Sequence, residues 1–275
     1  MQKSLKLRPI AGHLLRRVKR SLEPTPFVVD PAGHAFLASF PRSGNTWLRC
    51  VLFHYTLGRA PSNLAEIDFQ IPDEHSHLNE SDLITDTGPD QGAPRIVKTH
   101  AMFRVDRGYR RAVHIVRHPG HVLPSYYRYF ARKQSDLNFE TFIENCVLGS
   151  QWPGSWHDHT ISWMKGAEGR IENFDTVRYE DLVARDAAAT EAFAVSLGLA
   201  DPARLAELMA HYSLDKMREL EAAGNRKTEP AYAKKGQNFI GAGKAPEEQF
   251  ELVTDLIRTK APHWTALLDR FGYAI

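Results

Sequence analysis

The sequence predicts an α/β fold in which a central, mostly parallel sheet of about five strands is flanked by helices. Short apolar runs, typical of strands buried on both faces, alternate with segments of helical periodicity. Hydrophobic residues make up 43% and charged residues 25% of the 275 residues, which excludes a collagen-like, disordered or multi-span membrane chain. No repeat or linker divides the sequence, so we expect a basic arm over residues 1–30 and one domain over residues 31–275.

Three short apolar runs, each followed by polar residues, are the strongest strand candidates. They span residues 35–40, 95–98 and 112–116, and residues 176–179 could form a further strand. Carboxyl ends of parallel strands meet at one edge of a sheet, where ligands of such folds gather. The polar residues that follow these runs should therefore lie together.

Helical periodicity predicts the elements that connect these strands. The predicted segments are residues 45–55, 120–133, 139–148, 156–166, 184–223 and 246–259, the last of which is expected to close the chain. Residues 59–94 are rich in Pro, Asp, Asn and Ser, so we expect loops with short helices there. Residues 224–245 are rich in Gly and Lys and are expected to be irregular.

The N-terminal arm differs in charge from the rest of the chain. Residues 1–20 carry seven basic and no acidic side chains, although the whole chain has a net charge of only +2. The body is therefore acidic, and we expect no nucleic-acid partner. Apolar residues recur at spacings of three and four within residues 5–22, which predicts a basic amphipathic helix on an anionic membrane surface. An arm that packs on its own domain, or is partly disordered, is the alternative.

The two cysteines, Cys50 and Cys146, cannot form a disulfide framework and lie in no zinc-binding pattern. We expect both thiols in the core of a protein from a reducing, cytoplasmic compartment. The basic arm would place that protein at the periphery of a membrane. Histidine pairs spaced by two residues diverge on a helix, so we expect no metal site.

The turn after the first predicted strand has the composition of an anion-binding loop. Gly44 would let backbone amides approach a ligand, and the N-terminus of the following helix adds a positive partial charge. Arg42, Ser43 and Thr46 would supply further donors. Asn45 stands where a kinase-type P-loop requires lysine. A plain strand-to-helix turn remains the alternative for this segment alone.

A second anion site is predicted further along the chain. Arg117 follows the third apolar run and Ser125 lies two turns into the next helix, so the two could converge on one anion. Pro124 removes a backbone hydrogen bond within this helix and is expected to kink it, which could re-aim Ser125. An ion pair at the surface is the alternative for Arg117.

Taken together, these segments resemble the sulfotransferases that use 3′-phosphoadenosine 5′-phosphosulfate (PAPS). Five segments match in the family's order, and the similarity is closest to the soluble, cytosolic-type branch. They are residues 40–47 (the 5′-phosphosulfate loop), residues 98–100 (the catalytic segment), residues 117–127 (the 3′-phosphate motif), and residues 154–163 and 179–182 (two further signatures). The resemblance implies a P-loop-like domain.

The resemblance also implies a role for each matched residue. The residues implied to bind PAPS are Arg42, Ser43, Gly44, Asn45, Thr46, Trp47, Arg117, Ser125, Tyr179, Ser213, Leu214, Lys234, Lys235 and Gly236. Trp47 and Tyr179 would flank the adenine. Leu214 replaces a usual aromatic residue of the adenine pocket, and the family's tryptophan is missing after Gly236. Arg42 replaces the loop lysine that is usual in the soluble branch.

The resemblance implies a sulfonate transfer catalysed by three residues. His100, whose side chain titrates near neutrality, would be the general base, with a capping histidine at a strand end as the alternative. Lys98 and Arg42 would stabilise the transferring sulfonate and the leaving oxygen. The acceptor would be a hydroxyl, or in second place an amine, of a small molecule or carbohydrate. A P-loop phosphotransferase and a non-catalytic anion- or membrane-binding protein are the competing interpretations.

Overall fold

A computed structural model describes residues 33–74, 94–132, 134, 136–224 and 238–275. Within these ranges a single sheet of four strands has the order β2-β1-β3-β4, one strand fewer than expected. Its strands are β1 (His34–Ser39), β2 (Arg95–Thr99), β3 (Arg111–Val116) and β4 (Asn173–Arg178). The predictions for residues 5–22 and for Lys234, Lys235 and Gly236 lie outside the described residues.

All described strand pairs are parallel, with β1 in the centre of the sheet. In the register, Leu37 of β1 lies beside Lys98 of β2 on one side and Val113 of β3 on the other. The carboxyl ends of the strands therefore share one edge, as the sequence predicted. The polar residues that follow β1, β2 and β3 are placed at that edge.

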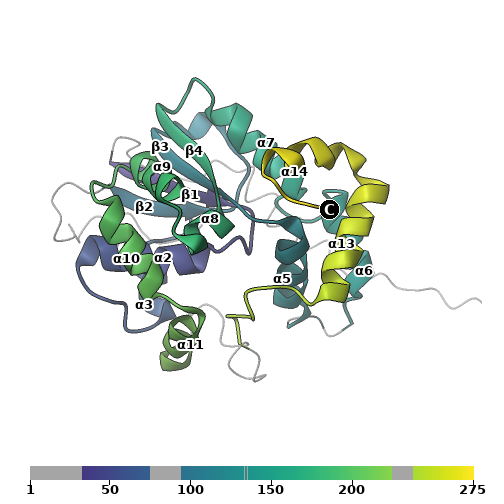
Figure 1. Cartoon of the computed structure of the whole chain (residues 1–275), viewed down its shortest axis with the longest axis horizontal. Helices are drawn as coiled ribbons and strands as arrows, with labels where there is room; N and C mark the ends of the chain where they lie inside the picture. The colour runs from purple at the N-terminus through teal and green to yellow at the C-terminus, as the bar shows by residue number, and fades with distance from the viewer. Residues whose placement is uncertain (1–32, 75–93, 133, 135, 225–237) are drawn as a thin grey trace, which may run out of the picture.

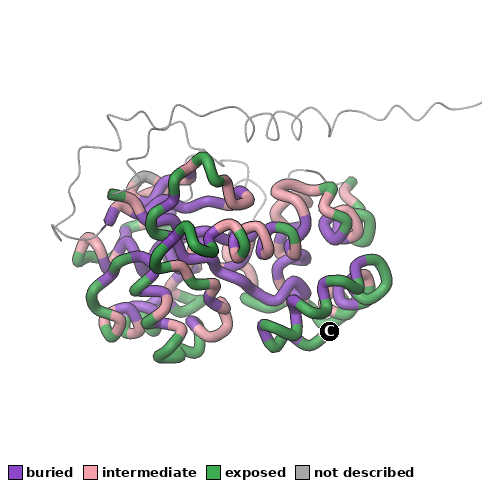
Figure 2. The backbone as a smooth tube through the Cα atoms, turned by 90° about the horizontal axis from the view of Figure 1, so that it is seen from above, coloured by how far each residue is buried: buried purple, intermediate pink, exposed green. Residues whose placement is uncertain are grey.

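Helices cover both faces of the sheet because side chains alternate along each strand. Ala35 and Leu37 of β1 pack toward one face, and Phe36 and Ala38 pack toward the other. The core on the first face is shared with α2 (Asn45–Leu57), α3 (Leu64–Gln70), α9 (Ala187–Leu197), α10 (Pro202–His211) and α11 (Leu214–Ala223). Of these helices, α9 packs on the strands, α3 packs on α2, and α11 packs on α3. The second face packs against Trp163 and Ala167 of α7 (Trp156–Ala167). Figure 2 shows the buried backbone running through the centre of the molecule.

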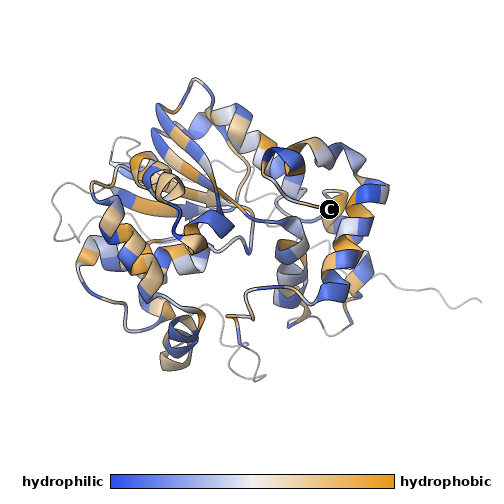
Figure 3. Cartoon of the chain, in the orientation of Figure 1, coloured by the Kyte–Doolittle hydropathy of each residue, from blue (hydrophilic) through white to orange (hydrophobic). Residues whose placement is uncertain are grey.

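A second group of helices has its own core beside the sheet (Figure 1). It consists of α5 (Pro119–Ala131), α6 (Phe139–Val147), α13 (Glu247–Lys260) and α14 (Thr265–Arg270). The sequence predicted the helix near residues 246–259 as the last element, but η2 (Pro262–Trp264) and α14 follow it. Trp264 explains the continuation, since its buried ring packs 5.7 Å from that of Trp156. Figure 3 shows both hydrophobic and hydrophilic residues along α13, as expected of a helix with one buried side.

Several boundaries differ from the prediction, and polar caps account for those within residues 184–223. Tyr179 begins α8 (Tyr179–Ala184) instead of ending β4. The predicted helical stretch 184–223 divides into α9, α10 and α11, and Asp201 and Ser213 accept hydrogen bonds at the starts of α10 and α11. Pro124 lies inside α5, as predicted. Cys50 and Cys146 are buried and free, which confirms their expected place in the core.

No helix within the described segments is long and apolar enough to cross a lipid bilayer.

Candidate active site

The loop between β1 and α2 has the geometry of an anion cradle. Gly44 adopts a left-handed conformation (φ 97°) at the start of α2, and no side chain caps this helix end. The ring of Tyr179 lies directly over Gly44, where a Cβ atom would overlap it. Backbone conformation and close packing therefore both require glycine here. The α2 amides can then face a ligand.

The side chain of Ser43 indicates whether this loop suits an anionic ligand. Its side chain is fully buried, and its Oγ has no hydrogen-bond partner among the described residues. A buried polar atom without a partner costs about 1–3 kcal/mol. An oxyanion bound in the loop would remove that cost, so the residues present fit the 5′-phosphosulfate group of PAPS. Thr46 lies half-buried on the first turn of α2.

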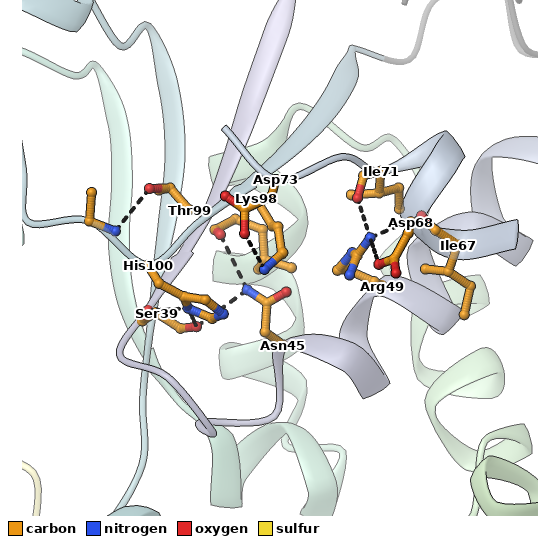
Figure 4. Close-up of polar contacts among 12 residues, drawn as sticks. Ser39, Asn45, Arg49, Ile67, Asp68, Ile71, Asp73, Lys98, Thr99 and His100 are labelled. Carbon is orange, nitrogen blue, oxygen red and sulfur yellow. Dashed lines mark hydrogen bonds and ion pairs between the residues drawn. The ribbon is translucent and has the colours of Figure 1, made fainter. Parts of the chain in front are cut away.

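The side chain of Asn45 has partners inside the protein. It is buried, and its Nδ2 donates to the Ser39 Oγ (3.3 Å) and to the Leu37 carbonyl (3.4 Å). Figure 4 shows this amide between β1 and the ring of His100. Asn45 thus ties the start of α2 to β1, a different role from the ligand role that the resemblance implied for it.

His100 lies at the end of β2, against the end of β1. Its Nδ1 is 2.8 Å from the Ser39 carbonyl oxygen and 3.3 Å from the Ser39 Oγ. Because a carbonyl oxygen only accepts, Nδ1 carries the proton and Nε2 keeps its lone pair. Burial and then the charge of Lys98 lower the pKa of His100 well below its ordinary value, although the Asp73 carboxylate opposes them. The ring is therefore neutral near pH 7, the form that a general base requires.

Lys98 forms an ion pair with Asp73, a residue that the sequence did not single out. The Lys98 Nζ is 2.6 Å from the Asp73 Oδ2, and the lysine side chain is only 7% exposed (Figure 4). The backbone holds the pair in place, since the amide of Lys98 donates to the Pro72 carbonyl and its own carbonyl accepts from Glu74. No local pattern marks Asp73, because its partner is distant in sequence.

Arg42 turns its side chain toward the predicted 3′-phosphate residues. Its Nε donates to the Ser125 Oγ (3.1 Å), and its Nη2 donates to the Phe239 carbonyl (3.0 Å). The guanidinium also lies 4.2 Å from the centre of the Phe239 ring. Arg42 therefore connects the β1–α2 loop, Ser125 and the segment before α13. Phe239 is a second residue that the sequence did not single out.

Arg117 and two aromatic residues form the next part of the site. The Arg117 guanidinium lies 4.4 Å from the centre of the Tyr179 ring, and its Nη2 donates to the Gly243 carbonyl. Tyr179 in turn meets Trp47 edge-to-face at 5.6 Å. The two rings are inclined by 80° and form a corner instead of a parallel pair. This arrangement can flank a base with two different aromatic surfaces.

The segment predicted to complete the adenine pocket contributes through its first residue. The carbonyl of Tyr212 accepts a hydrogen bond from the Trp47 Nε1 (2.9 Å). Ser213 and Leu214 are exposed, and the Ser213 hydroxyl caps α11 by accepting from the Lys216 amide. Tyr212 is thus the member of this segment that the structure joins to the predicted site.

Three signature residues hold the strand ends in place. The Trp156 Nε1 donates to the Arg117 carbonyl (3.0 Å), and the Trp163 Nε1 donates to the Ala101 carbonyl (2.9 Å). Glu180 accepts a hydrogen bond from the backbone amide of His118, the residue after Arg117 (3.1 Å). In the part of the chain that is described, no group of three or more His, Cys, Asp or Glu side chains could hold a metal ion.

The fold and the loop after β1 define the class of this protein. Residues 32–264 match the family model described as "Sulfotransferase domain", so the chain belongs to the sulfotransferase family.

Known relatives are similar over part of their length. The chain is 27% identical to Cytosolic sulfotransferase 5 of Arabidopsis thaliana over 180 residues, which are 59% of this chain and 55% of the relative. It is 25% identical to Sulfotransferase 1A1 of Mus musculus over 202 residues, 66% of each chain. The matches therefore cover about half to two thirds of these relatives. The crystal structure of mouse sulfotransferase SULT7A1, complexed with PAP, shows the same fold with a TM-score of 0.53, 19% identity, and coverage of 86% of this chain and 82% of that chain.

Proposed function

We propose that this protein transfers the sulfonate group of PAPS to a hydroxyl group of a small-molecule or carbohydrate acceptor, with 3′,5′-ADP as the other product. One observation carries the proposal: the Gly44 loop, His100 and Arg117 lie at one edge of a parallel sheet, where Arg42 contacts both Arg117 and Ser125. Membership of the family and the PAP bound to mouse SULT7A1 support it.

His100 acts as the general base in this proposal. Its Nδ1–H is held by Ser39, so the free Nε2 can accept the proton of the acceptor hydroxyl. As that proton leaves, the acceptor oxygen forms a bond to sulfur, and the bond from sulfur to the bridging phosphate oxygen breaks. The lowered pKa of His100 keeps Nε2 unprotonated at neutral pH.

Lys98 and Arg42 supply positive charge in the proposal. Lys98 shares the sheet edge with His100 and would stabilise charge on the transferring sulfonate and the leaving oxygen. For this it must share or exchange its ion pair with Asp73. Arg42 reaches Ser125 and would join the 5′ and 3′ sides of the nucleotide.

The nucleotide would lie across the strand ends. The residues proposed to hold it are Ser43, Gly44, Asn45 through its backbone, Thr46, Trp47, Arg117, Ser125, Tyr179, and the segments with Ser213–Leu214 and Lys234–Gly236. Of these, Trp47 and Tyr179 offer the adenine its aromatic corner. The buried hydroxyl of Ser43 would donate to the 5′-phosphosulfate. No step requires a metal ion in this scheme.

The acceptor class is taken from relatives. Retinol dehydratase, which has a similar fold (TM-score 0.52, 19% identity), was solved in complex with androsterone and PAP, so an apolar alcohol is the first acceptor to test. A cytoplasmic location with membrane-surface contact through residues 5–22 remains a prediction. Deletion of residues 1–22 should reduce partitioning onto anionic vesicles, and unchanged partitioning would contradict it.

Calorimetry and one variant test the proposal. The protein should bind 3′,5′-ADP without a metal ion more tightly than it binds ATP with Mg²⁺. Preference for ATP would favour a phosphotransferase, and binding of neither nucleotide would favour a non-catalytic protein. His100→Gln should lower turnover about 10²–10⁴-fold while 3′,5′-ADP affinity stays within about twofold. Near-normal turnover of this variant would remove His100 from the mechanism.

A further inference from the structure

A basic hollow opens beside the C-terminal half of α5. Its volume is about 710 Å³, and three arginines line it: Arg128, Arg132 and Arg218. The described residues of its wall include no acidic side chain. Asn238 and residues 240–242 complete its wall, in a segment that runs past the end of α5 toward α13 (Figure 1). The hollow therefore suits an anionic group.

Arg128 connects this hollow with the predicted 3′-phosphate site. It lies one helical turn after Ser125, and its Nη2 is 3.4 Å from the Ser125 Oγ. Gly241 packs so closely on the Arg128 guanidinium that a Cβ atom there would overlap it. The arginine is thus directed toward Ser125 from the side of the hollow.

The hydrogen bonds of the Ser125 hydroxyl leave room for a hydrogen-bond acceptor beside it. Arg42 and Arg128 both direct N–H groups at its oxygen. A hydroxyl oxygen has two lone pairs and one proton, so two donors engage both lone pairs and leave the proton to be donated. An anion next to Ser125 would accept that proton and would also meet both guanidinium groups.

Electrostatics favours the same conclusion. Burial and then the charges of Arg132 and Arg117 lower the pKa of Arg128. Guanidinium groups held together in a partly buried place repel one another, and a bound dianion converts that repulsion into attraction. Phosphate is the anion that matches several arginine forks at once.

We infer that Arg128 is a further ligand of the nucleotide's 3′-phosphate, acting with Arg117 and Ser125. The inference rests on the proposed function, because that function places the 3′-phosphate at Ser125. Arg128 would then contribute to the preference for nucleotides that carry a 3′-phosphate over those that lack it.

Calorimetry with 3′,5′-ADP and with 5′-AMP, which lacks the 3′-phosphate, tests the inference through the ratio of the two affinities. Arg128→Gln should reduce this ratio at least about tenfold by weakening 3′,5′-ADP alone, since a hydrogen bond between charged groups is lost. Arg258→Gln removes an exposed helix arginine of α13 and should leave the ratio unchanged. Arg218→Gln, on the far side of the hollow, should change it less than about twofold.

A second variant moves Arg128 without removing its charge. Gly241→Ala should displace the guanidinium and reduce the ratio as well, with thermal unfolding to confirm that both variants fold. An unchanged ratio in Arg128→Gln, or an equal loss in Arg218→Gln, would overturn the inference while the proposed function stands. A wild-type protein that does not prefer 3′,5′-ADP would instead overturn the proposed function, and the inference with it.

Discussion

His159 makes this fold sensitive to acid to an extent that can be calculated. Its ring is fully buried, and its Nδ1 lies 3.3 Å from the Nε2 of His114. Burial lowers the pKa of His159 from its ordinary value of 6.5 to about 3. Below pH 6.5 the unfolded chain therefore binds a proton that the folded chain does not. The stabilising contribution is complete above that pH and is lost progressively as the pH falls toward 3.

The loss of stability follows from the difference between the pKa of His159 in the folded chain and in the unfolded chain. Each pKa unit of the difference between the folded and unfolded chains corresponds to about 1.4 kcal/mol of unfolding free energy. The full effect is therefore about 5 kcal/mol, and about 2 kcal/mol of unfolding free energy is already lost at pH 5. Urea unfolding near pH 8 and near pH 5 measures it in the wild type and in His159→Gln. The variant should lose about 2 kcal/mol less between the two conditions. His263→Gln, an exposed control, should behave as the wild type. Equal losses in His159→Gln and the wild type would refute the assignment.

Three further substitutions test the site. Gly44→Ala should abolish 3′,5′-ADP binding in calorimetry, because the loop needs a left-handed backbone that alanine disfavours, and because the added methyl group overlaps the Tyr179 ring. Normal affinity would contradict the cradle. Asn45→Ala should lower kcat about fivefold with little change in 3′,5′-ADP affinity, since it removes the hydrogen bond to Ser39, the residue that holds His100. An equal loss of affinity would indicate that the Asn45 side chain binds the nucleotide directly. Lys98→Met should raise the pKa of His100 in an NMR titration, because it removes the nearby positive charge, and a lower value would contradict the proximity of the two groups.

The sequence predicted those parts of the fold that depend on local patterns. Apolar runs bounded by polar residues predicted β1, β2 and β3, because strands buried on both faces are apolar along most of their length. The edge strand β4 has exposed and polar residues and begins at Asn173, three residues before the predicted segment. Gly44 and the residues around it predicted the cradle, since a tight turn before a helix needs a particular backbone conformation. The parallel order then placed Lys98, His100 and Arg117 at one edge.

The remaining contacts depend on residues that are distant in sequence. Asp73 and Phe239 lie in segments predicted as irregular, and each meets its partner only once the chain has folded. Asn45 occupies a ligand position in the pattern, but its side chain is buried against β1, and a linear pattern does not show on which side of a loop a side chain lies. The segment of Tyr212, Ser213 and Leu214 contacts Trp47 through the Tyr212 backbone carbonyl, a contact that a pattern of side-chain types does not show.

The two buried tryptophans of α7 give the segment of residues 154–163 a structural role beside the site. Trp156 fixes the carbonyl of Arg117, and Trp163 fixes the carbonyl of Ala101, next to His100. Both indoles are fully buried, so each N–H must find an acceptor inside the protein. A single helix on one face of the sheet therefore sets the positions of two strand ends. Since the proposed base follows one of these strands and the arginine proposed to bind phosphate follows the other, α7 helps to set the separation of the two proposed groups.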